Sequence, residues 1–141
     1  MINREKLLEL IHEHGLAQYA DAILNASKPA IHISRKRVAD DAQIPVGASK
    51  LGGSPDVPLG FVWPQWNGTP LTFIGQFRLS EAAPFDVEHV LPQTGLLSFF
   101  YAVEEQTWGA PEQRGSWKVL YLESETAALQ RVAHPTASGG D

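Results

Sequence analysis

Hydrophobic residues near the N-terminus recur at intervals of three and four, the spacing that places them on one face of a helix. The recurring positions are Leu7, Leu8, Ile11, Leu16, Ala20, Ile23 and Leu24. Gly15 divides this stripe, and glycine suits the left-handed end of a helix better than its interior. The pattern therefore predicts two helices, over residues 3–14 and 16–27, with Pro29 preventing continuation of the second.

Alternation of apolar and polar residues further along the chain predicts β-strands. The predicted strands cover residues 30–38, 71–79, 96–103 and 117–123. Residues 96–103 are apolar on both faces, which is typical of a central strand covered on both sides. Gly75, in the middle of its strand, indicates a bulge or a close backbone approach. A short helix is expected over 124–133 and a flexible tail over 134–141.

Residues 45–70 differ in composition from the rest, because they hold five of the ten prolines and five of the twelve glycines. Such a segment forms little helix or central strand. It also carries two tryptophans and other large apolar side chains, which a disordered linker lacks. We therefore predict an ordered, extended segment lying across the core. Helices first and strands later predict a single α+β domain over 1–133, with the two helices packed on a mainly antiparallel sheet.

The 141-residue length fits one domain, and the net charge of −5 is unevenly distributed. Residues 1–50 carry a net charge of +1 and residues 51–141 one of −6. An acidic body repels phosphate backbones, so nucleic acid is not an expected partner. The one basic cluster, at residues 35–37, is interpreted as a solvated strand end.

Features that would indicate export or a membrane are missing from the sequence. It has no cysteine, no apolar run as long as the roughly 18 residues of a membrane span, and no signal-peptide core. We therefore expect a cytoplasmic protein without membrane contact. The sequence leaves the oligomeric state open.

Motifs for catalysis and metal binding are incomplete. The segment GASKLG around Ser49 lacks the glycine two residues after the serine that a nucleophile elbow requires. Its Ser-Lys order is also the reverse of that in a phosphate-binding loop. His12 and His14 are two residues apart, whereas metal-binding pairs on a helix are four apart. We therefore expect no catalytic residue, metal ion or cofactor, and favour a role other than that of an enzyme.

Five residues are candidates for contact with a ligand or partner. Lys50 is the only cation of the Pro/Gly-rich segment, and Gln76 and Arg78 share one face of a predicted strand. Trp63 and Trp66 lie on either side of a proline and together form a candidate stacking platform. Each candidate has a structural alternative, because tryptophan also seals cores and glutamine also bonds to the backbone.

The motifs of residues 49–101 resemble, in their order and spacing, the signature of the YwqG-like family of bacterial proteins of unknown function. They are SKLGGSPDVP at 49–58, GFVWP at 60–64, PL at 70–71 with Phe73 and Gln76, LP at 91–92, GLL at 95–97 and FFY at 99–101. The resemblance implies the order of elements but no reaction. It also implies that longer members continue with further strands, so the chain corresponds to the first part of their domain. Some relatives resemble companions of bacterial toxins, which implies a protein-binding or immunity role.

Three hypotheses about function follow. In the first, the chain is a non-catalytic protein-binding module that uses an acidic surface around Glu104 and Glu105 together with the two tryptophans. In the second, it is a small-molecule-binding domain or an enzyme with a groove near Lys50, Gln76 and Arg78. In the third, it is a structural fragment that needs further chain to complete its core. The first is favoured, because an acidic surface speeds encounter with a basic partner.

Overall fold

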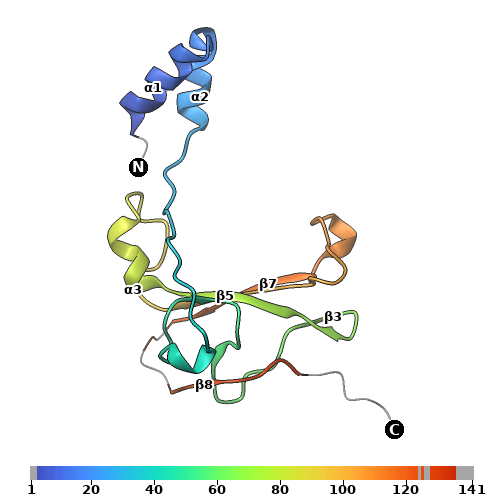
Figure 1. Ribbon diagram of the computed structural model, residues 1–141. Coiled ribbons are helices and arrows are strands. Elements are labelled where there is room, and N and C mark those ends of the chain that lie inside the picture. The colour runs from blue at the N-terminus through green and yellow to red at the C-terminus, as the bar shows by residue number, and fades with distance from the viewer. Residues whose placement is uncertain (1–2, 124, 126–127, 136–141) are drawn as a thin grey trace.

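The computed structural model describes residues 3–123, 125 and 128–135. Two helices begin the chain, α1 (Arg4–Glu13) and α2 (Ala20–Ala26), joined by a 3₁₀ turn, η1 (Ala17–Tyr19). Asn3 caps α1 by accepting a hydrogen bond from Lys6 N at 2.8 Å, and Gly15 adopts a left-handed φ of 68° just beyond the helix. Both predicted helices are confirmed, and they pack on each other as a helical hairpin (Figure 1).

Residues 27–39 form an extended arm between the helical hairpin and the rest of the chain (Figure 1). The strand predicted over 30–38 is wrong, because none of the strands in the described residues pairs with this stretch. At the nearest edge of the sheet stands β1 (Lys50–Leu51), which pairs with β5 (Thr72–Arg78) and not with the arm. The arm also holds the helices at a distance from the sheet, so the expected packing of helices on the sheet is not formed in the described part of the chain.

The body of the protein, residues 40–135, is built on a four-stranded antiparallel sheet, which confirms the α+β class. In order across the sheet, its strands are β1 (Lys50–Leu51), β5 (Thr72–Arg78), β6 (Leu96–Tyr101) and β7 (Trp117–Leu122). The last three confirm predicted strands. The register shifts between Phe73 and Gly75, which confirms the predicted bulge. A Cβ on Gly75 would lie 2.9 Å from Lys50 O, so the backbones of β1 and β5 also approach closely.

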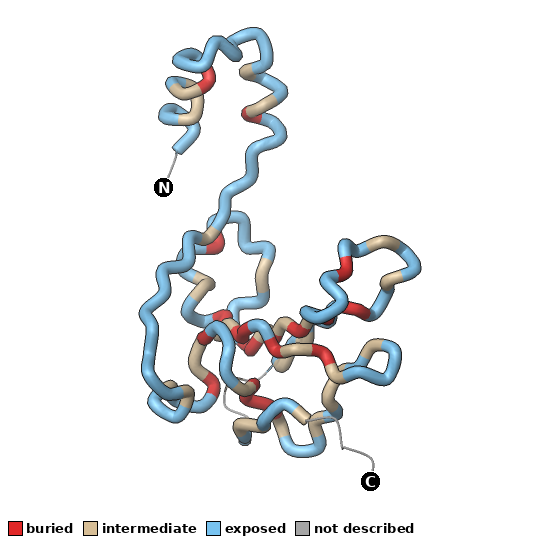
Figure 2. The backbone as a smooth tube through the Cα atoms, turned by 45° about the vertical axis from the view of Figure 1, so that its right-hand side comes forward, coloured by how far each residue is buried: buried red, intermediate tan, exposed pale blue. Residues whose placement is uncertain are grey.

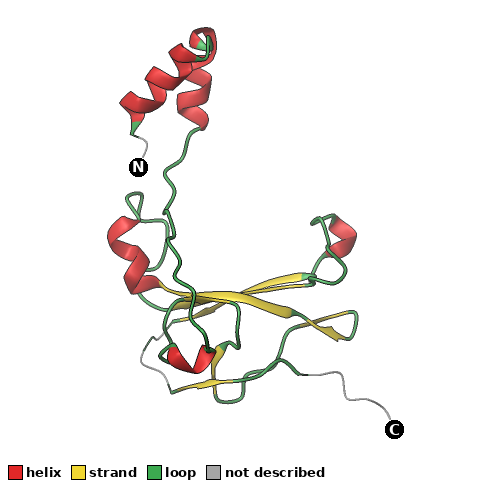
Figure 3. Ribbon diagram, in the orientation of Figure 1, coloured by secondary structure: helices red, strands yellow, loops and turns green. Residues whose placement is uncertain are grey.

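One side of the sheet is covered by the Pro/Gly-rich segment, which is ordered as predicted, and by two strand pairs (Figure 3). β2 (Asp56–Pro58) pairs with β8 (Leu129–Arg131), and β3 (Gln65–Trp66) pairs with β4 (Thr69–Pro70). The helix expected over 124–133 is therefore wrong where the chain is described, and residues 124, 126 and 127 lie outside that part. The strand is favoured there because Arg131 bonds to Asp56 across the pair at 2.8 Å.

The core lies between the sheet and the Pro/Gly-rich segment, where buried residues gather in Figure 2. Its members are Leu71, Phe73, Phe100 and Ala102, with Phe61, Trp63, Trp66 and Leu120 packed against them. Short helical turns flank the sheet: η2 (Asp41–Gln43), α3 (Leu79–Ala82), η3 (Ala83–Phe85) and η4 (Pro111–Gln113). His134, at the start of the predicted tail, packs edge-on against Trp63, and residues 136–141 lie outside the described part.

The second side of the sheet is open. Along β6, residues 96, 98 and 100 are buried, whereas residues 97, 99 and 101 are only half-buried. The prediction of a central strand covered on both sides is therefore wrong over the middle of the sheet, because the described segments on this second side, α3 with η3 and the loop that holds η4, stand at its two ends (Figure 3). The register places a set of apolar side chains there, which we call the open face: Leu51, Phe77, Leu97, Phe99, Tyr101, Trp117, Val119 and Tyr121.

Candidate functional site

A groove of about 1020 Å³ lies between the extended arm and the β1 edge of the sheet. One wall is formed by arm residues 31–38, and the other by β1, the end of β5, α3 and η3. Apolar side chains from both walls line it: Ile31, Ile33 and Val38 from the arm, and Leu51, Phe77 and Phe85 from the body. Lys50 and Arg78 also line it, so two of the residues expected to contact a ligand meet here.

Lys50 has its charge paired within the protein. Its side chain is 1% exposed, and Nζ donates a hydrogen bond to Asp41 Oδ1 at 2.8 Å. The other carboxylate oxygen of Asp41 accepts from Ser54 N at 3.0 Å. Lys50 therefore ties η2 to β1, and contact between this lysine and a ligand stays a prediction.

Gln76 is completely buried, at 0% exposure, in the centre of a group of polar side chains. Its Oε1 accepts from Asp56 N at 2.9 Å, and its Nε2 donates to Ala48 O and to Asp56 Oδ2, both at 2.8 Å. Asp56 also accepts from Gly47 N at 2.9 Å and from Arg131 Nε at 2.8 Å. The glutamine thus ties Ala48 and Asp56, which lie on either side of β1, to β5. This is the structural role that the sequence offers as the alternative to ligand contact.

We call this group the polar network; its side chains are those of Asp41, Lys50, Asp56, Gln76 and Arg131. Arg131 completes it by donating to the backbone carbonyls of Asp41 and Ile44. In the described residues, every buried side-chain nitrogen or oxygen has a hydrogen-bond partner. A fully bonded network fixes the position of the groove wall. Because its side chains bond to one another, they leave few hydrogen-bond donors for a ligand in the groove.

The two carboxylates of the polar network are held ionised. Burial by itself would raise the pKa of Asp56, but hydrogen bonds, above all that from Arg131, outweigh burial and leave this pKa below the ordinary 3.8. Burial also opposes ionisation of Asp41, and the hydrogen bond from Lys50 leads the contacts that lower its pKa below 3.8. The hydrogen bond to Asp56 in turn raises the pKa of Arg131.

We expect the protein to lose stability in acid within a window set by Asp41 and Asp56. Their pKa values are lower in the folded than in the unfolded chain, so the unfolded chain takes up protons first as the pH falls. The stabilisation is therefore fully present above about pH 5, and it is lost as the pH falls through 3.8 and then through the lower folded pKa. Thermal melts across this range measure the effect, which Asp56→Asn should reduce. A melting temperature independent of pH below 3.8 would contradict the assignment.

Basic side chains form the rim of the groove. Arg78 Nε donates to Gly47 O at 2.9 Å, and this bond holds the guanidinium at the groove wall. Residues 35–37, the exposed basic cluster, line the groove from the arm. Glu81 is the acidic residue of the lining, and its carboxylate accepts from the Ser49 hydroxyl at 2.7 Å. The groove therefore combines apolar walls with a rim of positive charge.

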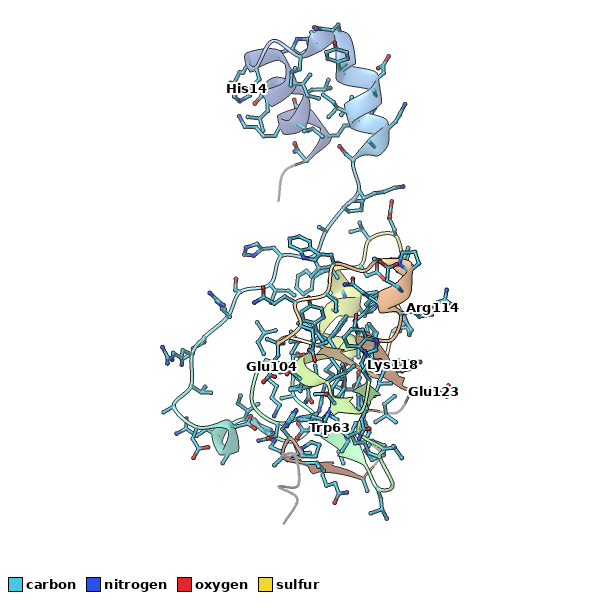
Figure 4. All side chains as sticks on the ribbon, turned by 90° about the vertical axis from the view of Figure 1, so that its right-hand side faces the viewer. His14, Trp63, Glu104, Arg114, Lys118 and Glu123 are labelled. Atoms are coloured by element: carbon cyan, nitrogen blue, oxygen red, sulfur yellow. The ribbon has the colours of Figure 1, made fainter. Side chains whose placement is uncertain are left out.

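Trp63 and Trp66 lie against the core rather than in the groove. Trp63 Nε1 donates to Leu71 O at 2.8 Å, and Figure 4 shows this side chain inside the body among those of other elements. Trp66 borders a depression of about 80 Å³ that Glu104 and Glu105 also line. The structure thus brings one tryptophan beside the acidic pair, and partner contact through these residues stays a prediction.

Three exposed aromatic side chains, those of Trp108, Trp117 and Tyr121, are not among the candidates that the sequence offers. Trp108 is 94% exposed in the loop before η4, and Trp117 and Tyr121 are 44% and 47% exposed on the open face. The alternation over 117–123 correctly predicted that the last two share one face of a strand. The alternation does not show whether another segment covers that face of the strand.

The described residues hold neither a cluster of metal ligands nor a membrane-spanning helix. No three histidine, aspartate or glutamate side chains in that part of the chain converge as metal ligands. The helices found there are all too short or too polar to cross a bilayer.

Comparison with known proteins identifies the family of the body. The family described as Domain of unknown function (DUF1963) matches residues 49–138, more than half of the chain. The search of curated proteins found no match to the chain. The matched range takes in the whole four-stranded sheet, the strand pair that holds Asp56 and Arg131, and the groove wall opposite the arm. The chain therefore belongs to the DUF1963 family, a domain of unknown function.

Proposed function

We propose that the chain is a YwqG-like domain that acts as a non-catalytic, cytoplasmic protein-binding module and holds an acidic, extended segment of a partner protein in the groove. The motifs over 49–101, on which the YwqG-like assignment rests, fall inside the matched family range. The observation that carries the binding role is the groove itself, which has apolar walls and a basic rim on a chain of net charge −5.

An extended peptide suits the shape of the groove, because one wall is an extended arm and the other a sheet edge. Side chains of an extended peptide alternate, so apolar ones would contact Phe77 and Phe85 while acidic ones face residues 35–37 and Arg78. The volume of about 1020 Å³ is at the upper end for small-molecule sites, which run to about 1,000 Å³. The basic rim also fits an acidic partner better than the basic partner expected from the acidic composition of residues 51–141.

Peptide binding measured by fluorescence anisotropy tests the proposal. The probe is a labelled peptide of roughly eight residues in which Glu and Val alternate, compared with a matching Lys and Val peptide. We expect the acidic peptide to bind more tightly and to weaken as salt is added. The double variant Arg35→Glu with Arg37→Glu should weaken it about tenfold, because each exposed charge contributes up to about 1 kcal/mol.

The matched control is Arg114→Glu with Lys118→Glu, which makes the same change in net charge at exposed positions outside the groove (Figure 4). This control should bind the acidic peptide almost as well as the unmodified chain. Equal binding of the acidic and basic peptides, or equal losses in the two double variants, would overturn the proposal. Thermal stabilisation by citrate, in the absence of any peptide binding, would also overturn it and favour the small-molecule hypothesis.

A further inference from the structure

The open face is too apolar to be left in water. Its edge residues Trp117, Val119 and Tyr121 on β7 are 44%, 50% and 47% exposed, and Leu51 on β1 is 51% exposed. The β6 side chains between them are half-buried at best, and the Phe77 and Phe99 rings meet edge-on at 5.7 Å. All four strands therefore present apolar side chains on one continuous side. A contiguous surface of this kind marks an interaction site.

The helical hairpin is the second incomplete apolar surface of the chain. Of its apolar stripe, only Ile11 and Leu24 are buried, at 4% and 8% exposure. Leu16 and Tyr19, at the turn between the helices, are 40% and 56% exposed. Two helices of 10 and 7 residues are too short to be stable without packing against something larger. The hairpin therefore needs a surface that its own chain does not provide in this structure.

The extended arm connects these two surfaces and keeps them apart. All of residues 27–39 are exposed except Ile31, and Pro29 stiffens the beginning of the arm. The far end is fixed at Asp41, which bonds to Lys50. Figure 1 shows the hairpin standing clear of the sheet, on the side opposite β8. This is the geometry of an element that is exchanged between two copies of a chain.

We propose that the helical hairpin of one copy docks on the open face of a second copy, and that the exchange is reciprocal in a two-fold dimer. The sizes match, because the 10-residue α1 is about 15 Å long and the six-residue β7 about 20 Å. The inference does not depend on the proposed function, since the groove meets the open face only at Leu51 and Phe77.

Charge complementarity supports a second copy as the occupant. The arm carries four cations and no acidic residue: Lys28, Arg35, Lys36 and Arg37. Residues 51–141 have a net charge of −6. In a reciprocal dimer, each basic arm would cross to the acidic body of the other copy, which favours association.

Cross-linking between copies tests the dimer directly, because the chain has no cysteine of its own. Tyr19→Cys in one copy and Val119→Cys in another are mixed and treated with a short bismaleimide. We expect a cross-linked dimer that contains one copy of each variant. Leu59→Cys, at a site that is 87% exposed and directly follows β2, serves as the control in place of Val119→Cys and should give little product.

Sedimentation velocity on the full chain supplies the second readout. Val119→Lys with Tyr121→Lys should raise the dimer dissociation constant at least about tenfold, because a lysine buried without a partner opposes docking. Lys118→Glu, whose side chain lies on the other side of β7, should leave it nearly unchanged. A monomer at every concentration, or a dimer insensitive to the double variant, would overturn the proposal. A chain carrying both cysteines that cross-links only within itself would overturn it too.

Discussion

Replacing Asp56 with alanine is expected to lower the free energy of unfolding by about 3–5 kcal/mol. The Asp56 side chain is 0% exposed, and it accepts hydrogen bonds from Arg131, Gln76 and Gly47 N. Alanine would remove the carboxylate that pairs with the charge of Arg131 and would leave the Gly47 N–H without its acceptor, and a buried group that loses its partner carries a desolvation cost. Urea unfolding followed by tryptophan fluorescence measures the change.

Two further variants make this result interpretable. Asp56→Asn keeps an oxygen acceptor but removes the charge, so it should lose less stability than alanine and remain measurable if alanine prevents folding. Glu88→Ala removes an exposed carboxylate and should stay within about 0.5 kcal/mol of the unmodified chain. If Asp56→Ala lost less than about 1 kcal/mol, the polar network would not be what holds β8 and η2 to the body.

The polar network could not be predicted from the sequence, because its members are far apart in the chain. Asp56 is 20 residues from Gln76 and 75 from Arg131. A polar side chain in a strand pattern does not show whether it faces water or a buried partner. The sequence therefore offers Lys50 and Gln76 as candidate contacts for a ligand and leaves a structural role for the glutamine open, and in the structure both have partners within the protein. Lys50 and Gln76 are directly opposite each other on β1 and β5, and only the register of the sheet shows this.

Periodicity predicted the main strands because alternation is a local property of the chain. The bulge at Gly75 was predictable for the same reason, since a glycine within a strand marks an irregularity where it stands. Which side of a strand is covered depends instead on segments elsewhere. Residues 96–103 are apolar on both faces, yet only one side of β6 is covered. A second copy on the open face, as proposed above, would account for that two-sided pattern.

The groove depends on placement that the sequence does not specify. The alternation over 30–38 has the pattern of a half-buried strand, but this stretch pairs with no strand of the described structure. The stretch becomes an arm instead, and its basic cluster lines the same groove as Arg78. Arg78 lines this groove, and its contact with a ligand stays a prediction. The apolar walls beside it come from the arm and from the body, which lie apart in the sequence.

Phe100→Ala is the second substitution with a large expected effect, a loss of about 3–5 kcal/mol of unfolding free energy. The ring is 2% exposed, and its centroid lies 5.6 Å from that of Trp63 and 5.6 Å from that of Phe73. Truncation removes this packing and leaves a cavity that the stiff sheet fills only in part. Chemical unfolding measures the loss, and the fluorescence of Trp63 should change in the folded state as its neighbour is removed.

Phe99→Ala is the matched control, because it removes the same side chain from the same strand on the other side of the sheet. Phe99 is half-buried on the open face, so its loss should cost clearly less stability at a dilution where the chain is a monomer. Equal losses at high dilution would contradict the assignment of the core to one side. A Phe99→Ala loss that grows with protein concentration would instead follow from docking, because the substitution then removes contacts between copies.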